Sequence, residues 1–241
     1  MSQRKHASIW FRGLRHRRRF KKRYDIINYF VRTRQYKTYL EIGTGTGRCM
    51  ERVTCASKTG VDPAPKRKDP DWTLHQMTSD EFFHANTGKF DLIFIDGLHT
   101  SDQVIKDIFN SLAALAANGV ILLHDSNPLT EEMQVKDPQL AAAGQWNGDV
   151  WKAIVYIRKC FPALFCRVFS VDQGVGIIIP DEDDPPPAYT PEVEKHALEF
   201  FENVTWDGLQ EDRRNLLGLV DNQTDFEGEF RRHQSKRNRA K

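Results

Sequence analysis

A loop with three glycines in five positions constrains the fold of this 241-residue chain more than any other stretch. It lies within residues 39–50, YLEIGTGTGRCM, directly after a short apolar run. Glycine costs conformational entropy on folding, so this density indicates a backbone that turns sharply or that a ligand approaches closely. A strand ending in Glu41-Ile42-Gly43, then a loop and a helix, places these glycines at the carboxyl end of a first strand. Ligands of open α/β sheets bind at that end.

Short β-rich runs alternate with helical patterns along the chain, which predicts a mostly parallel sheet with helices on both faces. We expect strands at residues 38–43, 59–62, 73–77, 91–96, 120–125, 166–172 and 175–180, the last two as a closing antiparallel hairpin. We expect helices at residues 22–34, 47–54, 79–85, 101–116, 149–159 and 192–201, and an irregular tail after them.

The same patterns divide the chain into three parts. Residues 1–21 form a basic arm, and residues 22–180 form the α/β domain. Within this domain, residues 127–149 are long for a strand-to-helix connection, where about 2–6 residues is usual, and they predict a lid over a binding crevice. Residues 181–241 begin with an acidic, proline-rich linker and end in a helix and a basic tail.

Charge is distributed unevenly. Residues 1–23 hold ten Lys and Arg residues and no acid, so the remainder carries a formal charge of −8 in a chain of net charge +2. The arm can bind nucleic acid or another anionic surface, or it can be a solvated arm that packs on the acidic body. No apolar stretch approaches the roughly 20 residues of a membrane helix, and the N-terminus lacks the apolar core of a signal peptide. We therefore expect a cytoplasmic protein without a membrane span.

The spacing of the glycines disfavours a dinucleotide fingerprint, which requires G-x-G-x-x-G. The pattern Glu41-x-Gly43-x-Gly45-x-Gly47 instead resembles the first motif of the class I S-adenosylmethionine (SAM) methyltransferases. The resemblance implies a Rossmann-like sheet in which the glycine loop, including Thr44, passes under the methionine part of SAM. It also implies that Asp62, at the end of the second strand, accepts hydrogen bonds from the ribose hydroxyls. Ser79, after the third strand, then lies where adenine is held.

Carboxylates end the next two predicted strands. Asp96 follows "FDLIFI", with His99 three residues later, and Asp125 follows "GVILLH", with Asn127 two residues later. Neighbouring strands lie roughly 5 Å apart, so Asp96 and Asp125 should face the same crevice. Two carboxylates and a carbonyl-type oxygen suit a hard cation such as Mg²⁺. His99 can then take a proton from a hydroxyl, because imidazole titrates near neutral pH.

This set of residues resembles the metal-dependent O-methyltransferases of the catechol and macrolide-sugar types. The resemblance implies Asp96, Asp125 and Asn127 as metal ligands and His99 as the general base. The chain departs from both types at the fifth strand: His124 stands where the sugar enzymes carry an acid, and Ser126 stands where the catechol enzymes carry Asn. Asp96 can alternatively contact SAM, His99 can be a helix-entry residue, and His124 can be a packed strand-end residue.

The lead hypothesis is therefore a SAM-dependent methyltransferase, a transferase that methylates a hydroxyl of a small molecule or a carbohydrate. Trp146, near the end of the predicted lid, suits a sugar acceptor, or it anchors the lid to the body. One alternative is a nucleic-acid methyltransferase that uses the basic arm. Another is a SAM-binding regulatory protein without turnover.

Overall fold

The computed structural model describes residues 20–141, 145–181, 184 and 188–240. Its centre is an eight-stranded sheet of order β3-β2-β1-β4-β5-β7-β6-β8. The strands are β1 (Thr38–Ile42), β2 (Ser57–Val61), β3 (Thr73–His75), β4 (Phe90–Ile95), β5 (Leu115–Leu123), β6 (Phe165–Phe169), β7 (Val175–Ile179) and β8 (Leu219–Val220). Strand β7 alone runs against its neighbours β5 and β6, whereas the other pairs are parallel. The predicted Rossmann-like α/β sheet with a closing antiparallel hairpin is thus confirmed.

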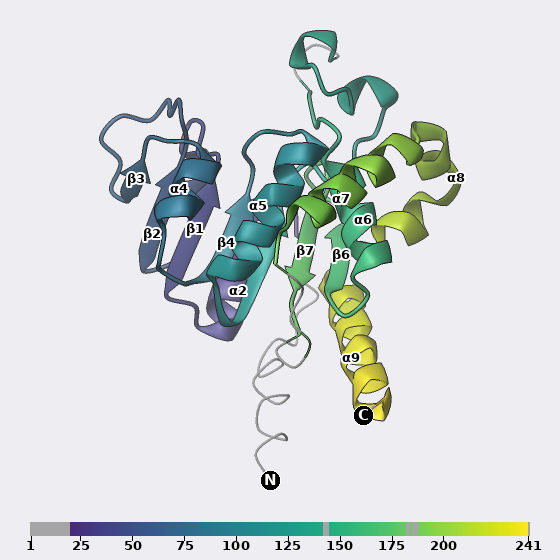
Figure 1. Ribbon diagram of the computed structural model, residues 1–241. Coiled ribbons are helices and arrows are strands. Elements are labelled where there is room, and N and C mark those ends of the chain that lie inside the picture. The colour runs from purple at the N-terminus through teal and green to yellow at the C-terminus, as the bar shows by residue number, and fades with distance from the viewer. Residues whose placement is uncertain (1–19, 142–144, 182–183, 185–187, 241) are drawn as a thin grey trace.

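Helices cover both faces of this sheet (Figure 1). The helices are α2 (Arg23–Arg34), α3 (Arg48–Arg52), α4 (Ser79–Ala85), α5 (Ser101–Ala114), α6 (Val150–Cys160), α7 (Pro191–Asn203), α8 (Trp206–Leu217) and α9 (Gln223–Ala240). The largest difference from the expected boundaries lies between α5 and β5: β5 begins at Leu115, five residues earlier than predicted, and α5 ends at Ala114.

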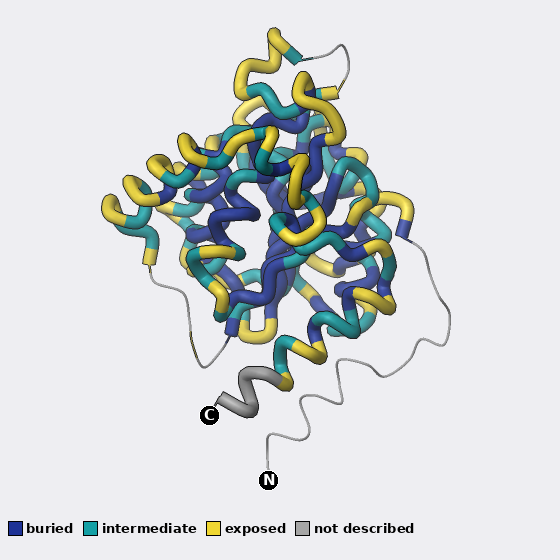
Figure 2. The backbone as a smooth tube through the Cα atoms, turned by 90° about the vertical axis from the view of Figure 1, so that its right-hand side faces the viewer, coloured by how far each residue is buried: buried dark blue, intermediate teal, exposed yellow. Residues whose placement is uncertain are grey.

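Two hydrophobic cores lie on opposite faces of the sheet because successive side chains of a strand point to opposite sides. In β4, Ile93 and Ile95 pack into one core, and Leu92 and Phe94 pack into the other. The first core includes residues of α5, α6, α7 and α8, and the second includes residues of α2 and α9. Figure 2 shows this buried interior running through the middle of the molecule, with exposed backbone around it.

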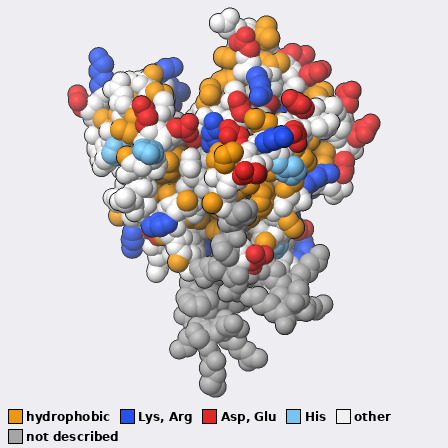
Figure 3. Space-filling model, in the orientation of Figure 1, with side chains coloured by type: hydrophobic (Ala, Val, Ile, Leu, Met, Phe, Trp, Pro, Cys, Tyr) orange, Lys and Arg blue, Asp and Glu red, His pale blue; other side chains and the backbone are white. Residues whose placement is uncertain are grey.

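The chain after residue 201 is not the irregular tail that we expected. Helices α8 and α9 and strand β8 follow, and β8 pairs with β6 at the edge of the sheet. Leu209, Leu217, Phe226 and Phe230 are buried in the two cores. These apolar residues are widely spaced among polar ones, which is why no strong periodicity marked them in the sequence. Figure 3 shows acidic side chains gathered on the side of the molecule where α7 and α8 lie.

The described residues of the predicted lid, 127–141 and 145–149, lie above the sheet, and they include two short 3₁₀ turns, Glu131–Met133 and Pro138–Leu140 (Figure 1). We keep the name lid for this segment. Leu129 and Leu140 on it are exposed. Residues 1–19 of the basic arm lie outside the described residues, while Phe20 is buried and packs edge-on against Phe169. Among the described residues, no helix is long and apolar enough to span a membrane.

Candidate active site

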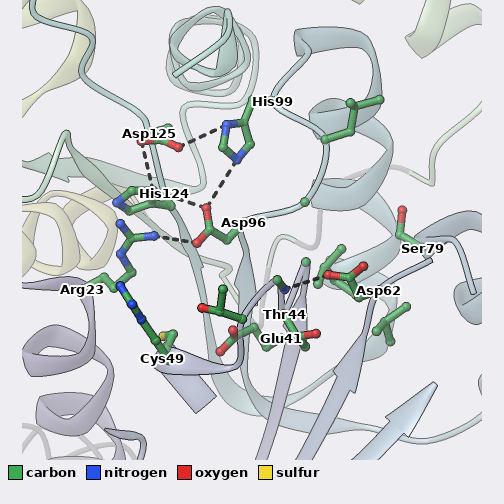
Figure 4. A pocket seen from close by; sticks show the side chains of 18 of the residues that line it. Arg23, Glu41, Thr44, Cys49, Asp62, Ser79, Asp96, His99, His124 and Asp125 are labelled. Atoms are coloured by element: carbon green, nitrogen blue, oxygen red, sulfur yellow. Dashed lines mark hydrogen bonds and ion pairs between the residues drawn. The ribbon is translucent and has the colours of Figure 1, made fainter. Parts of the chain in front are cut away.

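A pocket of about 1040 Å³ opens at the carboxyl ends of the parallel strands. One part, which we call the cofactor half, is lined by residues 43–46 of the glycine loop, Asp62 and Ser79. The other part, the acceptor half, is lined by Arg23, Asp96, His99, His124 and Asp125. Figure 4 shows the two halves side by side. The structure therefore brings the residues singled out in the sequence into one pocket, with the exception of Gly47 and Asn127.

Positive backbone angles explain why the loop needs glycine. Gly43, Gly45 and Gly47 have φ angles of +84°, +49° and +78°. A Cβ on Gly43 would lie 2.1 Å from the backbone oxygen of Asp96, so the loop rests directly on the chain of the acceptor half. A Cβ on Gly45, by contrast, would meet no described atom within 4 Å beyond its own chain neighbours, which leaves open space over the middle of the loop.

Asp62 fixes the loop. Its Oδ2 accepts a hydrogen bond from the Gly45 amide at 2.7 Å, and its Oδ1 accepts one from the Ala64 amide at 2.8 Å. Each oxygen keeps a further lone pair that can accept from a ligand hydroxyl. Thr44 in the loop is buried, and Ser79 begins α4 at the far end of the pocket. The cofactor half is thus built mainly from backbone and one carboxylate.

Glu41 lies fully buried beneath the loop. Its Oε2 accepts a hydrogen bond from the Tyr39 hydroxyl at 2.5 Å. Burial raises the pKa of Glu41 to about 8, because the charged carboxylate loses its hydration, although the Tyr39 hydroxyl opposes this shift. Glu41 is therefore largely protonated at neutral pH in the absence of a ligand.

In the acceptor half, the ring of His99 lies between two carboxylates. Its Nε2 is 3.4 Å from Asp96 Oδ1, and its Nδ1 is 3.2 Å from Asp125 Oδ2. Asp96 follows β4 and Asp125 follows β5, so the parallel register of these strands places both acids at one edge. Burial lowers the pKa of His99, but the two carboxylates outweigh it and raise the pKa above its ordinary value.

His124 lies beneath the same carboxylates and is 3 % exposed. Its Nδ1 is 3.0 Å from Asp125 Oδ1 and 3.3 Å from Asp96 Oδ1, yet within the described part of the chain neither ring nitrogen makes a well-aligned hydrogen bond. Burial lowers the pKa of His124, but Asp96 and Asp125 overcome this and raise it to about 9. One ligand atom from each of Asp96, His124 and Asp125 lies within 4.8 Å of the other two, an arrangement able to hold a metal ion.

Arg23 and Asp172 also belong to the acceptor half, and sequence reasoning missed them. Arg23 Nη1 lies 2.6 Å from Asp96 Oδ2, and its Nε donates to Asp172 Oδ2 at 2.9 Å. Burial raises the pKa of Asp172, but hydrogen bonds from Lys22 and Arg23 lower it to about 2. Strand β6 runs parallel to β5, so its end brings Asp172 to the same edge as Asp96. That topology was the available signal for Asp172, whereas Arg23 was counted with the basic residues of the N-terminus.

The end of the lid is fastened to the acceptor half. The Trp146 ring stacks on His99 with centroids 5.0 Å apart and an interplanar angle of 28°. The Asn147 amide nitrogen donates to Asp125 Oδ1 at 2.9 Å, and the Asp149 carboxylate accepts bonds from the backbone and the hydroxyl of Ser101. Trp146 Nε1 donates to the Val135 carbonyl within the lid. Trp146 therefore both anchors the lid and lines the pocket.

Asn127, the expected third metal ligand, points elsewhere. Its Oδ1 accepts a hydrogen bond from Arg213 of α8 at 2.7 Å, and Arg213 also bonds the carbonyl of Pro128. Helix α8 thus holds the start of the lid through Arg213. The sequence did not indicate this contact because the two residues lie 86 positions apart.

Comparison with known proteins agrees with this geometry. Residues 40–126 match the family model described as a methyltransferase domain. The SAH-bound methyltransferase PaMTH1 of Podospora anserina (SAH, S-adenosylhomocysteine) superimposes with a TM-score of 0.53 at 20% identity, over 68% of this chain and 80% of that one. An O-methyltransferase from Bacillus cereus in complex with SAH gives 0.50 at 13% identity, over 74% and 88%. No curated protein matches the sequence.

The family match and the shared fold define a class I methyltransferase domain that spans the glycine loop and both strand-end carboxylates. The chain is a SAM-dependent methyltransferase.

Proposed function

We propose that the protein transfers the methyl group of SAM to a hydroxyl of a small-molecule or carbohydrate acceptor, in the cytoplasm. The observation that carries the proposal is the position of His99 between Asp96 and Asp125, within the pocket that also contains the glycine loop. When an acceptor hydroxyl takes the place of the carboxylate at one ring nitrogen, the carboxylate at the other nitrogen still orients His99 as a general base for that hydroxyl.

In this proposal each residue has one task. Gly43, Gly45 and Thr44 pass under the methionine part of SAM, Asp62 accepts from the ribose, and Ser79 borders the adenine. The acceptor oxygen attacks the methyl carbon in line with the sulfur, and the electrons of the broken C–S bond go to sulfur, which becomes the neutral thioether of SAH. The hydroxyl proton goes to His99. The protein contributes mainly the alignment of these groups and the removal of that proton.

The residues around His124 fit a divalent metal ion. His124 is a buried imidazole without an aligned hydrogen bond within the described residues, and it faces the Asp96 and Asp125 carboxylates at 3.3 and 3.0 Å. A metal in this group would lower the pKa of an acceptor hydroxyl and neutralise the carboxylates. Mg²⁺ prefers oxygen ligands, and one imidazole shifts the preference toward Mn²⁺ or a similar transition metal.

Methyl transfer can be measured with isotope-labelled SAM against catechols, sugars with free hydroxyls, amines and short oligonucleotides. We expect methylation on oxygen of a hydroxyl acceptor, with Mn²⁺ or Mg²⁺ raising the rate and EDTA removing that increase. Methylation of an amine or a nucleobase would contradict the proposal. Binding of SAM without transfer to any acceptor would favour the regulatory alternative. Full O-methylation in excess EDTA would show that the reaction needs no metal ion, and the proposed role of His99 as the general base would stand.

A further inference from the structure

The lid places a further polar side chain against the Asp96, His124 and Asp125 group. Asn147 is 0% exposed, and its Nδ2 donates to Asp125 Oδ1 at 2.9 Å. Its Oδ1 is buried and has no hydrogen-bond partner within the described part of the chain. A buried amide oxygen without a partner is costly, and such groups in folded proteins are normally satisfied. This oxygen therefore indicates a ligand that the protein binds here.

The amide can satisfy that oxygen by turning over. A half-turn about the Cβ–Cγ bond exchanges the oxygen and the nitrogen, and their surroundings decide which of the two faces Asp125. With a bare carboxylate opposite, the nitrogen faces Asp125 and the oxygen is left without a partner. With a cation present, the oxygen can turn toward Asp125, because both oxygens then bind the cation. One cation would therefore satisfy Asn147 Oδ1 and His124 Nδ1 together.

The spacing of these groups is that of ligands on one ion. Two ligand atoms at right angles around an ion with bonds of about 2.1 Å lie about 3 Å apart. Here the Asn147 amide lies 2.9 Å from Asp125 Oδ1, and His124 Nδ1 lies 3.0 Å from that oxygen and 3.3 Å from Asp96 Oδ1. All three separations match neighbouring ligands, although Asn147 and Asp96 lie 51 positions apart in the sequence.

The backbone holds Asn147 in place independently of its side chain. The backbone N–H of Asn147 donates to the Met133 carbonyl at 2.8 Å. Gly148 follows with φ +57°, and a Cβ there would lie 1.7 Å from the His99 carbonyl oxygen. The Asp149 amide then donates to that carbonyl at 3.1 Å. A substitution at Asn147 therefore changes the amide group while the lid end stays attached.

We propose that Asn147 is a metal ligand that the lid contributes to the Asp96, His124 and Asp125 group, an inference that rests on the metal-assisted function proposed above. Binding of the metal then fastens the lid over the acceptor half. The lid contact takes the place of the amide ligand that was expected at Asn127, whose oxygen is occupied by Arg213.

The test is a titration of the full chain and three variants with Mn²⁺ alone. Electron paramagnetic resonance measures the free ion at each point of the titration. Asn147→Leu removes the oxygen and keeps the volume, and Asn147→Asp keeps an oxygen but removes the N–H group. Asn203→Leu, at the exposed end of α7, is the control. We expect Asn147→Leu to weaken Mn²⁺ binding about 10–100-fold, and Asn147→Asp and the control to bind at least as tightly as the parent. SAM affinity, measured in parallel, reports that each variant is folded.

The outcomes separate the ligand role from a structural one. If Asn147 served only to donate a hydrogen bond to Asp125, Asn147→Asp would bind Mn²⁺ as poorly as Asn147→Leu, because it lacks the donor and adds repulsion. That result, or parental binding by Asn147→Leu, overturns the proposal. Absence of Mn²⁺ binding by the parent would instead remove the metal from the proposed function, and this inference with it.

A second measurement follows the lid itself. Lys136 is an exposed residue of the lid and a site for trypsin. Mn²⁺ should slow cleavage after Lys136 in the parent and in Asn147→Asp but leave the rate unchanged in Asn147→Leu. Equal protection in Asn147→Leu and the parent would show that the metal acts on the lid without Asn147.

Discussion

The cofactor half and the acceptor half of the pocket share one edge of the sheet but are built in different ways. The cofactor half comes mainly from one short segment, residues 43–46, and a carboxylate, Asp62, that bonds to it, with Ser79 at its far end. Its main feature is backbone shape, set by three positive φ angles. The acceptor half collects ionisable side chains from α2 and from the ends of β4, β5 and β6, and the lid adds the Asn147 amide.

This difference in construction predicts which kind of substitution disrupts each half. A site formed by the shape of the backbone loses ligand binding when a side chain is added, because the added atoms fill the space of the ligand. A site formed by paired charges is disrupted when a side chain is removed, because the charge of its partner is left buried and uncompensated. Substitutions in the two halves should therefore affect different measurements.

The largest expected effect is on the acceptor half alone. His99→Ala should lower the rate of methyl transfer on the order of 10²–10⁴-fold, as loss of a positioned base does. The dissociation constant for SAM, measured by calorimetry, should stay unchanged, since His99 lies with the acceptor residues. His84→Ala, on the exposed side of α4, is the matched control and should retain full turnover. A parallel loss of SAM binding in His99→Ala would show that the two halves are not separable.

The next effect should be confined to the cofactor half. Gly45→Val should weaken SAM binding by about 10²-fold, because the new side chain enters the open space over the loop and the φ angle is positive. Gly88→Val, in an exposed loop where φ is not positive, is the control. Calorimetric titration with SAM gives the affinities. Unchanged affinity in Gly45→Val would place the cofactor elsewhere in the pocket.

A smaller effect should arise at Arg23, which joins Asp96 to Asp172. Arg23→Met should lower the free energy of unfolding by about 1–2 kcal/mol, because two carboxylates lose a partly buried cation and its hydrogen bonds. Lys22→Met removes a more exposed cation from Asp172 and should cost less. Urea unfolding of both variants measures the difference, and an equal cost for the two would show that the Asp96 contact contributes nothing.

The smallest effect concerns Glu41. Its folded-state pKa of about 8 lies above the ordinary value of 4.5, so the folded protein holds a proton that the unfolded chain releases. The stability from this group is complete below about pH 4.5 and declines as the pH rises toward about 8. Glu41→Gln should flatten the fall in melting temperature between about pH 5 and about pH 8, while Glu202→Gln on the surface should not. A parental slope in Glu41→Gln would mean that Glu41 is charged throughout.

The contrast between the halves also explains what could be predicted from the sequence. The glycine loop, Asp62 and the strand-end acids were identified because local chemistry and strand order position them. The mostly parallel sheet followed from the same alternation, and so did the closing antiparallel hairpin between β6 and β7. These features depend on short-range patterns that survive in a single sequence.

The rest depends on long-range packing. Arg23 was counted among the basic residues of the N-terminus, and its role became visible only when α2 was seen to begin near the carboxyl edge of the sheet. Asn127 and Asn147 both lie at ends of the lid, and no local pattern tells which one faces the carboxylates. Helices α8 and α9 were missed because their apolar residues are sparse and are buried by contact with distant strands.

Strand β8, only two residues long, has a consequence for how the chain can be divided. It pairs with β6 and so covers the last edge of the sheet. A fragment that stops at residue 180, where the expected α/β domain ends, would keep the pairing of β6 with β7. It would leave the other edge of β6 unpaired at Val168 and Phe169, and Phe165 would lose its contacts with Phe226 and Phe230. Unpaired edges with apolar neighbours join to one another between molecules. Such a fragment should therefore self-associate into aggregates, even though it contains the entire glycine loop and every strand-end carboxylate.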